Sequence, residues 1–171
     1  MGHPQKKDGV VGSSPSSPTR IHLNKCIFFS HWHKLITPIC LCYTDLMLII
    51  LSACLGFASV ALGAYADHGL TLALHEQTMI ATALRYNQLY AIVSTSIGLY
   101  ATLAPPSSIR THLTYTGYLF VLSTGLFSGS IYTAVIANAP QWTALTPVGG
   151  ILIMLAWISM VIVGIRIARA H

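Results

Sequence analysis

The sequence predicts an all-α membrane protein, a four-transmembrane-helix bundle with a disordered N-terminal extension. Of the 171 residues, 54% are hydrophobic and only 8% are Asp, Glu, Lys or Arg, whereas a soluble domain has roughly 25% charged residues. The apolar residues gather in three long runs without charged side chains. Because a chain of this length cannot wrap several buried helices in polar layers, we expect lipid around these runs.

The length of each charge-free run determines how many helices it holds. Residues 47–66 and 86–109 have room for one spanning helix each, because about 20 helical residues cross the hydrocarbon core. The run 111–165 has room for two, and Asn138-Ala-Pro140 marks the turn between them. The expected helices lie near 47–66, 80–103, 113–136 and 145–167.

The loops between these helices predict the orientation in the membrane. Arg110, Arg166 and Arg169 fall on one side of a four-span chain, and Arg85 falls on the other. Lys and Arg in short loops stay in the cytoplasm, so both termini are expected to be cytoplasmic. The connection 67–79 mixes charged and leucine side chains and is predicted to be a short interfacial segment.

Small residues recur at helical spacing in every expected span, with Gly125-Leu-Phe-Ser-Gly129 as a G-x-x-x-G motif. Such faces let helix backbones approach closely in lipid. Four of them in one chain favour packing within the chain.

Residues 1–46 differ from the rest, since Gly12-Ser-Ser-Pro-Ser-Ser-Pro-Thr19 is of low complexity and cannot bury a core. We expect this segment to be disordered, and we interpret it as an over-called start before Met47. A chain that starts at Met47 should then insert and accumulate like the full chain. No metal is expected, because the His and Cys residues of the segment fit no zinc spacing; they are Cys26, His31, His33, Cys40 and Cys42.

The net charge of +5 is spread along the chain rather than clustered on a basic face. Binding to phosphate backbones requires such a cluster, so nucleic acid is excluded as a partner. The expected partners are the lipid bilayer and, through helix faces, other membrane proteins or a second copy of the chain.

Four motifs follow one another through the apolar part: Gly63-Ala-Tyr-Ala-Asp-His-Gly-Leu70, Tyr86-Asn-Gln-Leu-Tyr90, Phe127-Ser-Gly-Ser-Ile-Tyr132, and Thr146-Pro-Val-Gly-Gly150 with Trp157. Over residues 47–171 the chain thereby resembles the small four-helix membrane proteins catalogued as domain-of-unknown-function family 423. The resemblance implies a bacterial inner-membrane location and no particular activity. The chain departs from the family pattern at Asp67, Tyr90 and Ala156, where Ala, His and Gly are expected.

Most motif residues are interpreted as structural. Gly69 is expected to end the first helix with a positive φ, and Thr146 to cap a helix whose first turn holds Pro147. Ser128 and Ser130 face different sides of their helix and lack a His-Asp pair, so a serine nucleophile is not expected. The structural set comprises Gly63, Gly69, Phe127, Ser128, Gly129, Ser130, Tyr132, Thr146, Pro147, Gly149, Gly150 and Trp157.

One cluster is a candidate polar site on the outer side, formed by Asp67, His68, Glu76, Arg85, Tyr86 and Tyr90. Tyr86 and Tyr90 share a helix face at i,i+4 and would point at a lid made by residues 67–79. Arg85 could pair there with Asp67 or Glu76. His68 could relay protons, because it titrates near neutral pH, or it could simply complement the helix dipole.

The sequence contains no catalytic constellation and no cofactor motif, so we expect no enzyme and no cofactor. The favoured function is a non-enzymatic structural or accessory membrane component. The alternative is a small transporter or channel subunit with an outer-side polar site around His68.

Overall fold

The computed structural model describes the backbone of residues 19–170 and the side chains of residues 43–169. The chain divides into two units, Met1–Thr37 and Pro38–His171. All side-chain contacts described below lie within the second unit.

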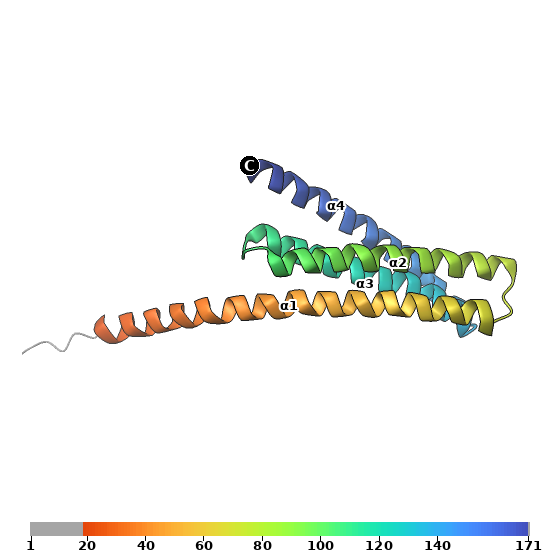
Figure 1. The fold of residues 1–171 in the computed structure, drawn as a ribbon, viewed down its shortest axis with the longest axis horizontal. Helices are drawn as coiled ribbons and strands as arrows, with labels where there is room; N and C mark the ends of the chain where they lie inside the picture. Colours follow the sequence, from red (N-terminus) through yellow and green to blue (C-terminus); the bar gives the residue numbers. More distant parts are fainter. Residues whose placement is uncertain (1–18, 171) are drawn as a thin grey trace, which may run out of the picture. The chain divides into compact units, whose positions relative to one another are not determined.

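The described chain is helical (Figure 1), which confirms the all-α prediction. The elements are α1 (Thr19–Gly69), α2 (Leu74–Leu103), α3 (Ser108–Ile136), the 3-10 helix η1 (Pro140–Leu145) and α4 (Thr146–Ala170). Three segments are long and apolar enough to cross a membrane, namely Tyr43–Gly69, Ser108–Ile136 and Pro140–Arg169. The helix α2 is 30 residues long but carries Glu76 and Arg85 in its first half, and it is not among the three.

The helices α2 and α3 begin earlier than expected, because side chains outside the apolar runs cap them. α2 starts at Leu74 rather than near residue 80, with the Glu76 carboxylate accepting a hydrogen bond from the Ala73 backbone N–H at 2.9 Å. α3 starts at Ser108, and the Ser107 hydroxyl accepts from the Arg110 N–H at 3.1 Å. The connection between α1 and α2 is therefore shorter than the expected 67–79, because only residues 70–73 separate the two helices.

The expected boundary of the bundle at Met47 also differs from the structure. Residues 19–46 are helical rather than disordered, while the prediction for residues 1–18 lies outside the described part. Asp45 is fully buried, and the Thr44 carbonyl accepts a hydrogen bond from the Tyr118 hydroxyl at 2.6 Å. The bundle therefore includes residues that precede the first charge-free run.

α3 packs against both α2 and α4 and brings the helices of this unit to a common core. One cluster of buried side chains joins Leu48 of α1 to Tyr90 of α2, Phe120 of α3 and Ile153 of α4. A second cluster includes Ala66, Ile80 and Ile131, at the end where α1 and α2 connect. Together, these two clusters pack the helices against one another.

Glycines permit the closest helix approaches. A Cβ atom on Gly98 would lie 2.7 Å from Ile49 Cγ1, and one on Gly117 would lie 2.6 Å from Leu48 Cδ2, so α1 approaches α2 and α3 only because both positions lack a side chain. The G-x-x-x-G motif behaves differently. Added Cβ atoms on Gly125 and Gly129 would meet nothing within 4 Å, so the preference for packing within the chain does not hold at these two glycines.

Candidate functional site

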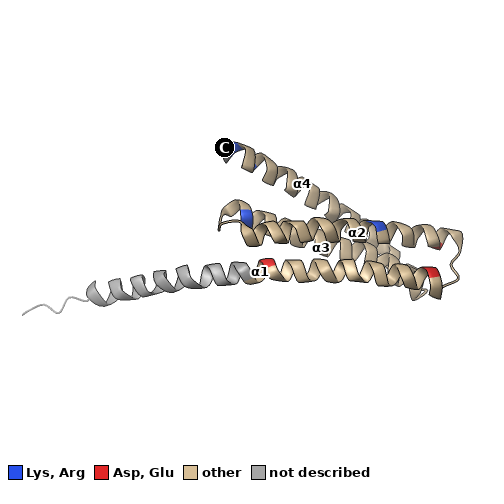
Figure 2. Ribbon diagram, in the orientation of Figure 1, with Lys and Arg blue, Asp and Glu red and all other residues tan. Residues whose placement is uncertain are grey.

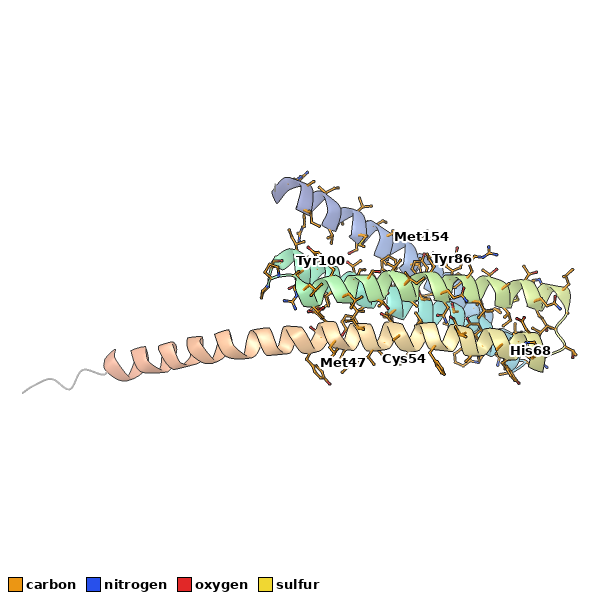
Figure 3. All side chains as sticks on the ribbon, in the orientation of Figure 1. Met47, Cys54, His68, Tyr86, Tyr100 and Met154 are labelled. Atoms are coloured by element: carbon orange, nitrogen blue, oxygen red, sulfur yellow. The ribbon has the colours of Figure 1, made fainter. Side chains whose placement is uncertain are left out.

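The structure does not bring the six residues of the predicted outer-side cluster together. Asp67 and His68 are exposed on the last turn of α1, where Figure 3 labels His68. Glu76 is occupied in capping α2, as described above. Arg85 is exposed and, among the described side chains, takes part in no ion pair, so the expected pairing with Asp67 or Glu76 is absent.

Tyr86 and Tyr90 share one face of α2 as predicted, with ring centroids 5.9 Å apart. That face is turned to α3 and α4 rather than to residues 67–79. Tyr86 lies 5.0 Å from the Phe127 ring, and Tyr90 stacks on Phe120 at 5.2 Å. The Trp157 indole N–H donates to the Tyr90 hydroxyl at 3.1 Å. These aromatic side chains link α2, α3 and α4 instead of lining a pocket under a lid.

A pocket of about 370 Å³ does lie between the end of α1 and the start of α2. Asp67 is the only member of the predicted cluster that lines it, beside Leu70, Leu72 and Gln77. The Gln77 side-chain amide donates to the Leu72 carbonyl at 3.0 Å. This bond links the first turn of α2 to the connection that precedes it.

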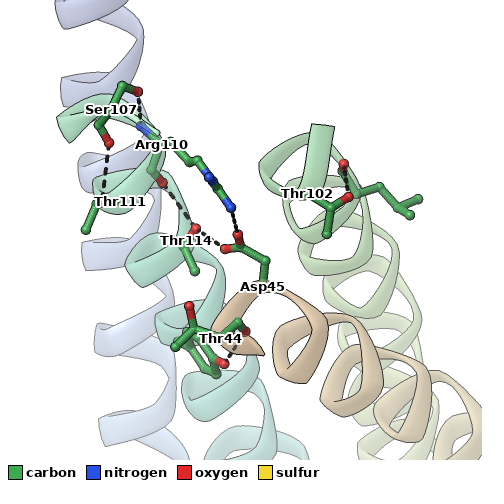
Figure 4. A network of polar contacts seen from close by, with 9 residues as sticks. Thr44, Asp45, Thr102, Ser107, Arg110, Thr111 and Thr114 are labelled. Atoms are coloured by element: carbon green, nitrogen blue, oxygen red, sulfur yellow. Dashed lines mark hydrogen bonds and ion pairs between the residues drawn. The ribbon is translucent and has the colours of Figure 1, made fainter. Parts of the chain in front are cut away.

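The most buried polar cluster of the described chain lies between α1 and α3 (Figure 4). The Arg110 guanidinium forms an ion pair with the Asp45 carboxylate, through Nη2 and Oδ2. The Thr114 hydroxyl donates to the other carboxylate oxygen at 2.8 Å. Asp45 is 0% exposed and Arg110 is 7% exposed, and few other charged side chains occur along these helices (Figure 2). We define Asp45, Arg110 and Thr114 as the Asp45 network.

Sequence reasoning missed the Asp45 network because Asp45 was assigned to the extension and Arg110 to a loop. Two signals could have revealed it. Arg110, Thr114 and Tyr118 recur at i,i+4,i+8 and therefore share one face of α3. Asp45 lies just before the first apolar run, and a charge near a span is expected to find an opposite charge.

The Arg110 Nε atom is buried and has no hydrogen-bond partner. The guanidinium therefore depends on Asp45 for the neutralisation of its charge. A buried charge without a counterion is strongly unfavourable. The ion pair of this cluster links α1 to the start of α3.

The third and fourth motifs are in contact with each other. The Ser130 and Thr146 hydroxyls are hydrogen-bonded at 2.7 Å, and a Cβ on Gly149 would lie 2.6 Å from the Phe127 backbone nitrogen. Ser128 faces the other way, donating to the Ala83 carbonyl of α2 at 3.0 Å. The two motifs thus join α3 to α4 and α2.

Two details of the structural interpretation of the motifs are wrong. Thr146 does not cap α4 as predicted: it is the first residue of the helix, and its hydroxyl is bonded to Ser130. No glycine in the described part has a positive φ, so Gly69 does not end α1 in the left-handed region. A Cβ on Gly69 would lie 2.9 Å from the ring of the exposed Tyr65. The residue with a positive φ is Asn138, at 49°, in the predicted turn after α3.

No three His, Cys, Asp or Glu side chains within residues 43–169 come together to hold a metal ion. The Cys and His residues considered at the sequence level between 26 and 42 lie outside the described side chains.

Comparisons with known proteins identify relatives among membrane proteins. The family described as "Protein of unknown function (DUF423)" matches residues 62–150. The UPF0382 inner membrane protein YgdD of Escherichia coli K12 is 32% identical over 128 residues, which cover 74% of this chain and 95% of that protein. The UPF0382 membrane protein YwdK of Bacillus subtilis 168 is 29% identical over 120 residues, 69% of this chain and 95% of that protein.

A UPF0382 membrane protein of Haemophilus influenzae is 32% identical over 118 residues, covering 66% of this chain and 88% of the relative. No solved structure is significantly similar to the chain. The matched region contains all four motifs that the sequence analysis identified, up to Gly150. From these matches and its apolar helices, the chain belongs to the DUF423 family of membrane proteins of unknown function.

Proposed function

We propose that the protein is a non-enzymatic structural or accessory component of the membrane, acting by assembly with lipid, with other membrane proteins or with itself. The observation that carries this proposal is the use of the buried polar side chains. Several of them bond to a neighbouring helix, so these side chains help to hold the bundle together.

Three such bonds illustrate the point. Ser128 donates to the Ala83 carbonyl and joins α3 to α2. Asn87 donates to the Leu55 carbonyl at 3.2 Å and joins α2 to α1. Thr116 and Ser159 are bonded at 2.6 Å between α3 and α4. Interhelical hydrogen bonds of this kind contribute about 0.6 kcal/mol each on average in membranes.

The test separates a structural interior from a site of chemistry. Ser128→Ala and Asn87→Leu variants are expressed in cells that lack their own copy of the gene, and membrane abundance is measured beside growth. In the proposed role any growth defect follows the protein level. Normal abundance with lost function would contradict it, and so would ion or solute flux through vesicles that contain only this chain.

We also propose that α2 spans the membrane, which gives four spans with both termini cytoplasmic. A helix of 30 residues is about 45 Å long and exceeds the hydrocarbon thickness of about 30 Å. Arg110 in the first turn of α3 and Arg166 and Arg169 near the end of α4 support this orientation.

Reporter fusions after Gln141 and His171 are therefore expected to give opposite signals, as are fusions within residues 70–73 and 104–107. The second pair isolates α2, because only that helix separates them. Equal signals from this pair would show that α2 does not cross and that the two ends of the bundle are not on opposite sides.

A further inference from the structure

Three buried polar atoms between α2 and α3 have no hydrogen-bond partner among the described residues. They are Asn87 Oδ1 of α2, and Thr124 Oγ1 and Tyr132 Oη of α3. Each of these side chains is at least nine-tenths buried. Buried polar groups in native structures nearly always have a partner, either in the protein or in an ordered water molecule. Three such atoms in one region indicate a partner that they share.

The other end of the Asn87 amide fixes its orientation. Its Nδ2 atom donates to the Leu55 carbonyl of α1 at 3.2 Å. Because a carbonyl oxygen can only accept, the amide nitrogen must face Leu55, and Oδ1 points elsewhere. Asn87 Oδ1 is therefore an acceptor that requires an N–H or O–H donor.

The register of α2 and α3 brings the other two groups toward Asn87. The helices run antiparallel, and Ser128 of α3 donates to the Ala83 carbonyl of α2. Four residues along each helix from this bond, Thr124 lies level with Asn87. Helix side chains lean toward the N-terminus of their helix, so Tyr132 extends back toward the same level. Its hydroxyl is near enough to interact with the Asn87 side chain, although the two form no direct hydrogen bond.

The cluster lies far from both ends of its helices. Asn87 is near the middle of α2, and Thr124 is near the middle of α3. Hydrocarbon at this depth offers no hydrogen-bonding group, so the missing partner must lie inside the bundle. Ala83 and Ala91 flank Asn87 one turn away on either side and are buried. No long side chain at these two positions competes for the space beside Oδ1.

The three groups suit a water molecule. Asn87 Oδ1 accepts, whereas the hydroxyls of Thr124 and Tyr132 can each donate or accept. A buried water makes about three hydrogen bonds to groups that otherwise lack partners. A cation suits the cluster less well, because none of the three groups is charged and an unpaired charge is costly at this depth.

We propose that one buried water molecule is bound between α2 and α3, where it donates to Asn87 Oδ1, accepts from the Tyr132 hydroxyl and has Thr124 as its third partner. The Asn87 amide extends this connection to the Leu55 carbonyl, so the water joins three helices at mid-depth.

The first experiment measures unfolding of the full chain in lipid nanodiscs. Tyr132→Phe and Thr124→Val remove the hydroxyls with little change of shape. Each variant loses a hydrogen bond to the water, so its folding equilibrium constant should fall about fivefold. A hydroxyl without a partner would give the opposite result, because its removal would relieve a desolvation cost. A higher melting temperature for Tyr132→Phe would overturn the proposal.

The double variant Thr124→Val with Tyr132→Phe tests whether the water is shared. Its effect should differ from the product of the two single effects, because both hydroxyls bind one molecule. Independent effects would overturn the shared site. So would a coupling of Tyr132→Phe with Asn87→Leu that leaves Thr124 independent of both, since this is the result of a direct bond between Asn87 and Tyr132.

Tyr118→Phe is the matched control for the double variant. Tyr118 lies on the same helix, but its hydroxyl has a direct partner, the Thr44 carbonyl. It should combine independently with Thr124→Val. An equal coupling in this control pair would overturn the proposal, because the coupling would not be specific to the cluster.

The second experiment detects the water in the unmodified chain. Solid-state NMR in lipid bilayers measures the transfer of magnetisation from water protons to side chains. Transfer to the Asn87 side chain should be as fast as transfer to the exposed Asn138, and faster than transfer to the fully buried Leu48. Transfer to Asn87 at the rate of Leu48 would show a dry cluster and overturn the proposal.

Discussion

Replacing Asp45 with alanine is expected to destabilise the bundle by about 3–5 kcal/mol, because Arg110 is left buried without its counterion. Arg110 is only 7% exposed, and its Nε atom has no other partner. The measurement is thermal unfolding of the purified chain in lipid nanodiscs, together with its abundance in membranes.

Asp67→Ala is the matched control, since Asp67 is an exposed acid on the same helix. Its effect should stay within about 0.5 kcal/mol, as is usual for surface substitutions. The double variant Asp45→Leu with Arg110→Leu removes both charges and should recover most of the stability. If the Asp45→Ala and Asp67→Ala variants unfold at the same temperature, the Asp45 network does not hold the bundle together.

The Asp45 network also changes what is expected of a chain that starts at Met47. Such a chain lacks both the carboxylate that pairs with Arg110 and the Thr44 carbonyl that accepts from Tyr118. It should therefore accumulate less than the full chain, contrary to the expectation from the apolar runs alone. Arg110→Leu should restore part of its accumulation.

Gly149→Ala is expected to be the most harmful glycine substitution. The added Cβ would lie 2.6 Å from the Phe127 nitrogen and 2.7 Å from its Cα. A backbone cannot move aside as a flexible side chain can, so α3 and α4 must separate. Overpacking of this kind costs about 1–3 kcal/mol and occasionally more.

Gly125→Ala and Gly150→Ala are the controls for this prediction. Neither added Cβ would come closer than 4.0 Å to a neighbour, and alanine favours a helix over glycine by about 0.5–1 kcal/mol. Both variants should melt at or above the wild-type temperature. If all three alanine variants lose the same amount of thermal stability, glycine is needed for some reason other than the contact with Phe127.

The helical architecture could be predicted from the sequence because charge-free runs have one physical explanation in a chain of this size. Helix ends could not be predicted as well, since caps such as Glu76 and Ser107 extend helices beyond the apolar runs. The i,i+4 spacing of Tyr86 and Tyr90 correctly predicted that they share a face. The spacing could not predict which helices that face would contact, because the periodicity of one helix carries no information about its packing partners.

The Asp45 network shows a different limit. A charged residue at the edge of an apolar run can lie in an exposed loop or form a buried ion pair. Only the tertiary contacts distinguish these two cases. The interlocked motifs at Phe127 and Gly149 were expected to be structural from their residue types. Their mutual contact could not be foreseen, since it joins segments on separate helices.

The separation of Asp45 and Arg110 along the chain constrains biosynthesis. The two residues are 65 positions apart, so at about 5–20 residues per second the ribosome makes Arg110 about 3–13 s after Asp45. During this interval the carboxylate has no counterion and is most stable among hydrated headgroups. α1 therefore inserts without its final neighbour and reaches its final depth only after the start of α3 has been synthesised.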